Sequence, residues 1–113
     1  MDLSGELSTE ASDDAVQFTY RVRNRGDEPV DLRFRSGQRI DVVVTEADSD
    51  RPAWRASDGR MYTMAIGFVH LDPGEAATFE EVWREPRPGA YRAEATLAAD
   101  GVAAPAETTF DVG

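Results

Sequence analysis

Apolar side chains recur at every second position along much of this 113-residue sequence. In the stretch AVQFTYRVRN, the residues Val16, Phe18, Tyr20 and Val22 alternate with polar ones. Successive side chains of a β-strand point to opposite faces of the sheet, so the alternation predicts a strand with one buried face. The stretches VDLRFR, IDVVV and YRAEATL repeat this pattern and predict three further strands.

Four other stretches predict strands less regularly. Residues 63–71 (TMAIGFVHL) place Met64, Ile66 and Phe68 on one side and small apolar residues on the other, which is typical of a strand covered on both faces. In residues 76–84 (AATFEEVWR), Glu81 shares a face with two aromatic residues, which predicts a β-bulge. The closing stretch GVAAPAETTFDV predicts a last strand, and DLSGEL near the start predicts an edge strand.

Short turn sequences separate these strands. NRGDEP, LDPGE and REPRPG carry the glycine and proline of tight turns. In SGQ, Gly37 is expected to supply a backbone angle that other residues avoid. The longest irregular stretch, residues 45–62, contains Trp54, which is expected to fill a place in the core. Seven or eight strands without a helix predict an all-β fold, an immunoglobulin-like antiparallel β-sandwich that forms one domain over residues 1–113.

The chain is strongly acidic. Its 22 aspartates and glutamates face 12 basic residues, all of them arginine, and the formal net charge is −10. Salt of about 1 M shortens the Debye length to about 3 Å and so screens repulsion among carboxylates. The composition therefore favours a cytoplasm of very high salt; an ordinary acidic protein from a GC-rich genome is the alternative. The same charge argues against a nucleic-acid partner.

The sequence indicates neither an enzyme nor a metal protein. Its single histidine, His70, is not accompanied by the Gly-x-Ser-x-Gly motif of a serine hydrolase. It has no cysteine, and EADSDR lacks the glycine and the distant glutamate of a calcium loop. We therefore expect no catalysis, no metal and no cofactor. The acidic N-terminus lacks a secretory pattern and no apolar run is long enough to span a membrane, so we expect a cytoplasmic protein without a membrane partner.

Several short motifs occur in a fixed order along the chain. They are Ser36-Gly37-Gln38 followed by Asp41, the segment from Trp54 to Ser57, Leu71-x-Pro73-Gly74, Trp83, and Pro88-Gly89-x-Tyr91. In this order and spacing they resemble the BsuPI family of intracellular proteinase inhibitors, over about residues 14–99. The resemblance implies a compact immunoglobulin-like domain. For the founding type of the family, it also implies an inhibitor of a major cytoplasmic serine proteinase.

A protein partner follows from this resemblance, and we expect a monomer that binds a subtilisin-like serine proteinase through loops. The residues expected at the contact are Ser36, Gly37, Gln38, Asp41, Trp54, Arg55, Ser57 and Arg87. Two loops have features of an inhibitory segment: residues 50–61 have the reach, and residues 85–89 have two stiffening prolines. A non-inhibitory protein-interaction or assembly domain on the same scaffold is the alternative.

Some of these residues also have a structural interpretation. Gln38 or Asp41 can hydrogen-bond nearby backbone and hold its loop, without touching a partner. Tyr91, two residues after Gly89, resembles a tyrosine corner, in which the hydroxyl bonds backbone at a sheet junction. Trp54 and Trp83 are expected in the core before any interface role.

Overall fold

The computed structural model describes residues 2–113, which form nine β-strands and no helix. The strands are β1 (Leu3–Ala11), β2 (Ala15–Asn24), β3 (Val30–Phe34), β4 (Ile40–Glu46), β5 (Pro52–Arg55), β6 (Gly67–Leu71), β7 (Ala76–Arg84), β8 (Gly89–Leu97) and β9 (Ala106–Val112). All of their pairings are antiparallel. The predicted all-β class is confirmed.

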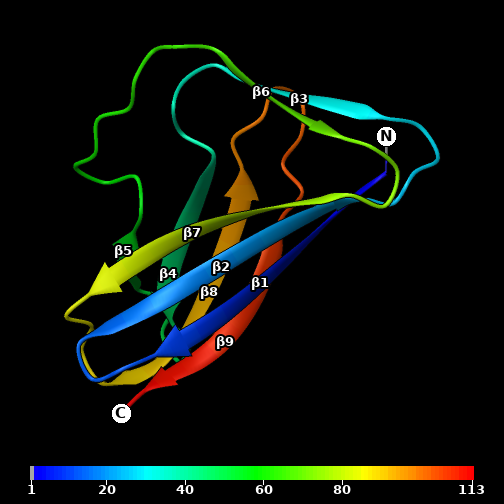
Figure 1. Ribbon diagram of the computed structural model, residues 1–113. Coiled ribbons are helices and arrows are strands. Elements are labelled where there is room, and N and C mark those ends of the chain that lie inside the picture. The colour runs from blue at the N-terminus through cyan, green and yellow to red at the C-terminus, as the bar shows by residue number, and fades with distance from the viewer. Residues whose placement is uncertain (1) are drawn as a thin grey trace.

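The strands form two packed layers and a small third sheet. One layer has the strand order β1-β2-β7, and the other has the order β5-β4-β8-β9. Figure 1 shows the two layers lying over one another, with β1 beside β9 along one side. The third sheet, β3 with β6, lies at one end of the sandwich. Loops at that end are therefore carried by strands of both layers.

Alternation along the strands produces the core between the layers. Val16, Phe18, Tyr20 and Val22 of β2 are fully buried, as the sequence predicted. The inward residues of the opposite layer are also buried; they are Ile40, Val42 and Val44 on β4 and Tyr91, Ala93, Ala95 and Leu97 on β8. Burying an aliphatic or aromatic side chain contributes about 1.5–3 kcal/mol, so this two-sided apolar layer is the main source of stability.

A chain of aromatic rings runs through one end of the core. Trp54 stacks on Phe18 at 5.7 Å and on Trp83 at 6.0 Å between ring centroids. Trp83 meets Tyr91 edge to face at 5.1 Å, and Tyr91 stacks on Phe110 at 5.6 Å. Such pairs add about 0.5–1.5 kcal/mol each beyond burial. These contacting rings come from both layers, and they confirm that Trp54 packs against the core.

Two buried tyrosines fix loops to the sandwich through their hydroxyls. The Tyr91 hydroxyl donates to the backbone carbonyl of Arg87 at 2.6 Å, which confirms the predicted tyrosine corner. The Tyr20 hydroxyl donates to the carbonyl of Ala104 at 2.6 Å, and burial raises the pKa of Tyr20 to about 12. Each bond gives a buried polar group its partner, as a packed interior requires.

The prediction for residues 63–71 is wrong in its first half. The strand begins only at Gly67, and Met64, Ile66 and Phe68 are 85%, 55% and 66% exposed. Among the described residues, β6 pairs with β3 alone, and the exposed side chains of Phe68 and His70 show that one face of this small sheet is open to solvent. An apolar stripe that the alternation assigned to the interior therefore faces solvent.

The predicted bulge in residues 76–84 is also wrong. β7 pairs with β2 in unbroken register from Ala76 to Arg84. Glu81 does face inward between Phe79 and Trp83, but Arg60 neutralises it, so the strand needs no bulge to turn it outward. The irregularity lies instead between Val44 and Thr45, where β4 meets β5.

One of the nine strands, β5, was not predicted from the sequence. Its four residues, Pro52–Arg55, are too few to display an alternating pattern, and they begin with a proline. They pair with β4 at the edge of the second sheet, where a proline is tolerated. The strand shortens the irregular stretch that the sequence placed at residues 45–62.

Candidate functional site

Exposed apolar side chains are concentrated in one segment of the chain. Met61 is 98% exposed, and with Met64, Ile66 and Phe68 it supplies four of the five large apolar side chains exposed in the described residues. We call residues 60–68 the apolar segment. Residues 60–66 belong to the connection from β5 to β6, which crosses one end of the molecule (Figure 1), and residues 67 and 68 begin β6. A concentration of exposed apolar surface typically marks a protein-interaction site.

Arg55 and Ser57, which lead into the apolar segment, are held by Asp41 of β4. Its Oδ1 accepts the backbone N–H groups of Val42 at 2.9 Å and Ser57 at 3.1 Å. Its Oδ2 accepts the Ser57 hydroxyl at 2.8 Å and the Arg55 guanidinium at 3.2 Å. The structural interpretation of Asp41 therefore holds, and the bonds reach a loop 16 residues further along the chain.

The start of the apolar segment is fixed by an ion pair with β7. Nη1 of Arg60 lies 2.7 Å from both carboxylate oxygens of Glu81. The Glu81 side chain is only 11% exposed, so water screens this pair less than it screens an ordinary surface pair. Removal of either partner would leave the other charge poorly compensated.

The middle of the apolar segment rests against Gly37. The Gly37 N–H donates to the carbonyl of Thr63 at 2.8 Å. A Cβ at position 37 would lie 2.7 Å from Oγ1 of Thr63, closer than side chains approach one another. The expected reason for Gly37 is corrected here, because the glycines with positive φ are at other positions. Close approach of the apolar segment, not an unusual backbone angle, is what favours glycine.

The end of the apolar segment lies against Arg39, a residue that the sequence analysis did not single out. The Arg39 guanidinium lies 4.5 Å from the Phe34 ring centroid and donates to the Ser36 carbonyl at 2.8 Å. It also lies against the backbone of Gly67, where an added Cβ would be 2.6 Å from Nη2. Nothing in the local sequence pattern signals this role.

Ser36 and Gln38 act locally. The Gln38 N–H donates to the Ser36 hydroxyl at 3.2 Å, and the Gln38 side-chain amide donates to the carbonyl of Ile40 at 3.3 Å. These bonds shape the loop that presents Gly37 to Thr63. The motif Ser36-Gly37-Gln38 thus forms a support for the apolar segment.

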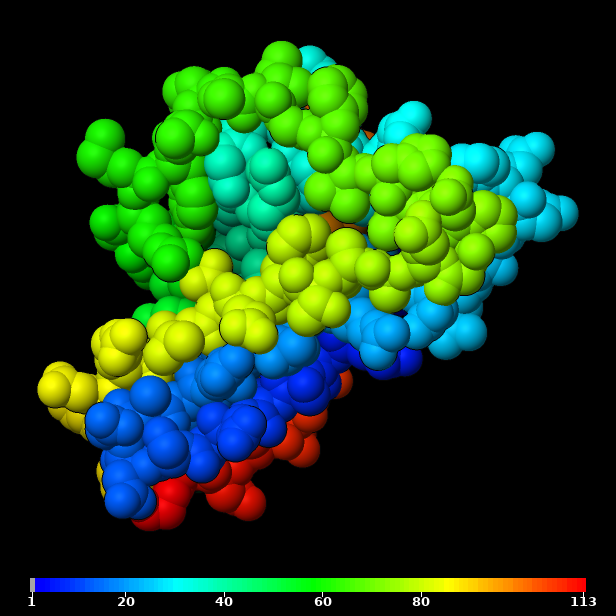
Figure 2. Space-filling model, viewed as in Figure 1, coloured from blue at the N-terminus to red at the C-terminus, as the bar shows by residue number. Residues whose placement is uncertain are grey.

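A groove separates the apolar segment from β7. Its volume is about 620 Å³, and its lining includes Arg39, Ile40, Met61, Tyr62 and Phe79. Figure 2 shows this part of the surface hollowed, with the green connection above and yellow β7 below. The segment therefore stands clear of the body of the sandwich between its points of attachment.

The structure brings together most of the predicted contact residues, but not all of them. Ser36, Gly37, Gln38, Asp41, Arg55 and Ser57 lie around the approach to the apolar segment. Trp54 turns its ring toward the core and is half-buried.

Arg87 lies apart from this group. It lines a hollow of about 470 Å³ with Glu46 and Pro52, at the opposite end of β4 from Ile40. The length of β4 separates the two ends by about 20 Å.

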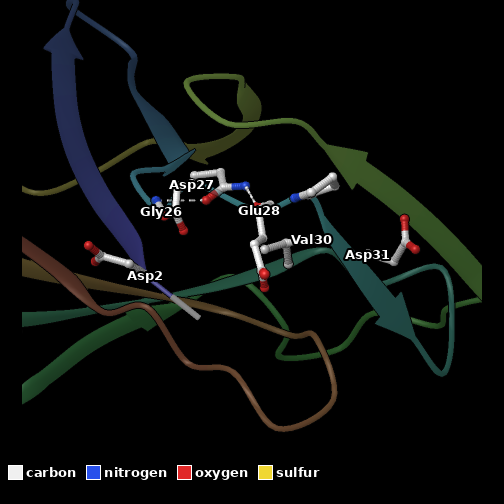
Figure 3. Close-up of a pocket in the computed structure, with 8 residues that line it drawn as sticks. Asp2, Gly26, Asp27, Glu28, Val30 and Asp31 are labelled. Atoms are coloured by element: carbon white, nitrogen blue, oxygen red, sulfur yellow. Dashed lines mark hydrogen bonds between the residues drawn. The ribbon is translucent and has the colours of Figure 1, made fainter.

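The acidic side chains near the N-terminus do not converge on one point. A hollow of about 390 Å³ is lined by Asp2, Asp27, Glu28 and Asp31, among others. Figure 3 shows the labelled carboxylates of Asp2, Glu28 and Asp31 spread around it. Within residues 2–113, no group of three histidine or acidic side chains is placed to hold a metal ion.

His70 lies on the surface of β6 between two carboxylates. Nδ1 is 2.6 Å from Asp31 and Nε2 is 2.7 Å from Asp72. Hydrogen bonds to Asp31 first and to Asp72 second raise the pKa of His70. Because both ring nitrogens are engaged and the side chain is half exposed, the arrangement resembles a surface ion pair more than a catalytic base in a cleft.

Replacement of Asp41 tests the attachment of the apolar segment. We expect Asp41→Asn to lower the free energy of unfolding by about 1–3 kcal/mol, because an amide replaces an acceptor of four hydrogen bonds. Urea unfolding followed by circular dichroism measures the loss. Asp48→Asn is the matched control, since it removes the same charge from an exposed residue. Equal unfolding midpoints for the two variants would show that the Asp41 network does not stabilise the loop.

Comparison with solved structures supports the sandwich fold. The chain matches the CARDB domain of a Pyrococcus furiosus protein, solved in complex with di-metal ions, with a TM-score of 0.55 and 18% identity, covering 99% of this chain and 88% of that one. It matches Spo0M, a sporulation control protein from Bacillus subtilis, with a TM-score of 0.52 and 16% identity, covering 97% of this chain and 48% of that one. Identities this low indicate a shared fold and nothing about function.

Larger proteins contain a domain of the same shape. A β-glucosidase from Kluyveromyces marxianus matches with a TM-score of 0.56 and 14% identity. The match covers 99% of this chain but only 14% of the glucosidase, so the likeness concerns one small part of that enzyme. No curated protein matches the sequence. The described residues also contain no helix of the length and apolarity needed to cross a membrane.

The sequence itself matches a family model. The model is described as BsuPI, intracellular proteinase inhibitor, and it covers residues 3–102 of the 113. This range includes every motif on which the resemblance was based, and it extends beyond residues 14–99 at both ends. The chain therefore belongs to the BsuPI family of intracellular proteinase inhibitors.

Proposed function

We propose that this protein is a proteinase-inhibitor-like binding module that engages a cytoplasmic subtilisin-like serine proteinase. Membership of an inhibitor family supports a protein partner and a role other than catalysis. The subtilisin-like target and binding through loops go beyond family membership and are our proposal. Binding occurs through loops at the end of the sandwich that carries the small β3–β6 sheet.

One observation carries the proposal: the apolar segment is exposed, yet it is bonded to the scaffold at its start and middle and at Ser57 just before it. Asp41 holds Ser57, Glu81 holds Arg60, and Gly37 holds Thr63. A segment that is already ordered loses little conformational entropy on binding, so more of its contact energy appears as affinity. Attachment on both sides also keeps the two ends of the segment in place within a proteinase cleft.

The predicted contact residues then divide into two roles. Ser36, Gly37, Gln38, Asp41 and Ser57 position the segment, and Trp54 fixes β5 beneath it. Arg55 is exposed beside the apolar segment and is paired with Asp41, whereas Arg87 lies at the other end of β4 and takes no part in this surface. Of the two loops considered from the sequence, residues 50–61 lead directly into the apolar segment, whereas residues 85–89 lie at the other end of β4.

A proteolysis assay with an intracellular subtilisin-like proteinase tests the proposal. An equimolar amount of the purified protein should suppress hydrolysis of a peptide substrate at matched salt. The double variant Met64→Glu/Ile66→Glu should lose this effect, because it places two charges on an apolar contact. Ser8→Glu/Thr109→Glu is the matched control, with two charges on exposed strand positions elsewhere. Unchanged hydrolysis with the wild-type protein would reject the proposal.

A non-inhibitory interaction or assembly role is the second candidate. An exposed apolar segment can serve a partner that is not a proteinase equally well, because a fold does not fix a function. Under this alternative, the wild-type protein leaves proteolysis unchanged, and affinity capture from lysate recovers a partner that is not a proteinase. Loss of that capture in Met64→Glu/Ile66→Glu would assign the same surface to this second role.

A further inference from the structure

Met61 differs from the other side chains of the apolar segment in one respect: its neighbours on both sides are attached, while its own side chain is free. We propose that Met61 enters the primary specificity pocket of the target, which is therefore a proteinase with a deep apolar pocket for a long unbranched side chain. This inference rests on the proposed inhibitory function and names the residue and the class of target.

The attachments lie immediately before and after Met61. Before it, Arg60 binds both oxygens of Glu81 at 2.7 Å. After it, the Arg60 guanidinium lies 5.9 Å from the Tyr62 ring centroid, and the carbonyl of Thr63 accepts the Gly37 N–H at 2.8 Å. Met61 itself is 98% exposed, so its side chain projects from a fixed piece of backbone.

The backbone around Met61 is also available. Residues 61–66 contain no turn, bend or residue with positive φ. In the part of the chain that the structure describes, their only backbone hydrogen bond is the one that Thr63 receives from Gly37. Extended peptides bind by adding a strand to a partner, with backbone hydrogen bonds giving affinity and side-chain pockets giving specificity. Residues 61–66 offer unpaired backbone groups for such hydrogen bonds and exposed side chains for such pockets.

Met64 fits the role less well. It is 85% exposed, but in the described part of the chain neither Met64 nor Ala65 has a backbone hydrogen bond, so its position is less fixed. If the primary pocket of the proteinase were acidic, Arg55 and Arg87 would be the side chains to fill it. Arg55 is committed to Asp41, and Arg87 lies at the far end of β4. A net charge of −10 would in addition oppose a partner whose pocket is acidic.

Inhibition constants for three variants and two classes of proteinase test the assignment. The probes are a subtilisin-type enzyme with an apolar primary pocket and a trypsin-type enzyme with an acidic one. The wild-type protein should inhibit the first and not the second. Met61→Ala should weaken inhibition by about 100-fold or more, as loss of a pocket-filling side chain does, and Met64→Ala by less than about 10-fold. Met61→Lys should shift inhibition toward the trypsin-type enzyme.

The possible failures are distinguishable. If the wild-type protein inhibits the subtilisin-type enzyme but Met61→Ala is as effective, the inhibitory function stands and the assignment of Met61 is wrong. Inhibition of the trypsin-type enzyme alone would overturn the apolar pocket while retaining inhibition. If neither class is inhibited, both proposals fall. Because Met61 is almost fully exposed, its variants should melt at the wild-type temperature, and equal melting temperatures establish that each variant is folded.

Discussion

Trp83→Ala is expected to lower the free energy of unfolding by about 3–5 kcal/mol, the usual cost of removing a large buried aromatic side chain. Trp83 is 8% exposed and contacts both Trp54 and Tyr91, so it links the two sheets. A domain of this size is stable by only about 5–15 kcal/mol, so the loss is a large fraction of the total. Urea unfolding followed by circular dichroism measures it.

The neighbouring Val82 provides the control. It lies on the same strand with its side chain pointing outward, and it is 40% exposed. Val82→Ala should cost less than about 1 kcal/mol, since it mainly changes strand propensity. If both variants unfold at the same urea concentration, the aromatic chain between the sheets is not a principal source of stability.

Thermal stability is expected to rise with salt. Between dilute and molar sodium chloride, the melting temperature should increase by at least about 5 °C, the shift that about 1 kcal/mol produces in a domain of this size. The reason is that 22 acidic residues face 12 basic ones, and salt screens the excess repulsion. The arginine–carboxylate pairs are mostly at the surface, so their weakening in salt costs little. Calorimetry or circular dichroism measures the melting temperature.

The same salt series near pH 4.4 separates charge screening from general salt effects. The sequence isoelectric point is about 4.4, so the net charge is then close to zero and the repulsion is absent. Near pH 4.4, the rise of melting temperature with salt should be only a small fraction of the rise seen at about pH 7. A flat melting temperature at neutral pH, or equal slopes at the two pH values, would contradict the high-salt interpretation of the composition.

The parts of the fold that the sequence predicted correctly are those fixed by local alternation. β2, β4 and β8 carry strict period-two patterns, and their apolar faces lie where the pattern placed them. Alternation is a local property of a strand, so it can be recognised without knowing the partner strand. Tyr91 was predictable for the same reason, because its hydroxyl bonds the backbone of Arg87, four residues earlier.

The parts that the sequence did not predict depend on partners far along the chain. Glu81 faces inward because Arg60, 21 residues earlier, neutralises it. Gly37 is favoured by the approach of Thr63, which no local pattern shows. An acidic residue between two inward aromatics was the available signal at Glu81, but it indicated a bulge as readily as a buried partner.

The apolar segment shows how an alternating pattern can mislead. The sequence predicted a strand covered on both faces, but Met64, Ile66 and Phe68 are all exposed. Alternation cannot tell which side meets the core when both sides are apolar. The exposed stripe, which is the basis of the functional proposal, became visible only when the pairing of β6 with β3 was known.

The central claim is that the apolar segment is exposed and yet rigid in the free protein. Backbone ¹⁵N relaxation of residues 60–63 tests it most directly. The order parameters should be close to those of β2 and β8, about 0.85, because Asp41, Glu81 and Gly37 hold the segment in place. Values below about 0.6 would mean that the segment is flexible, and they would contradict the account of how this protein binds.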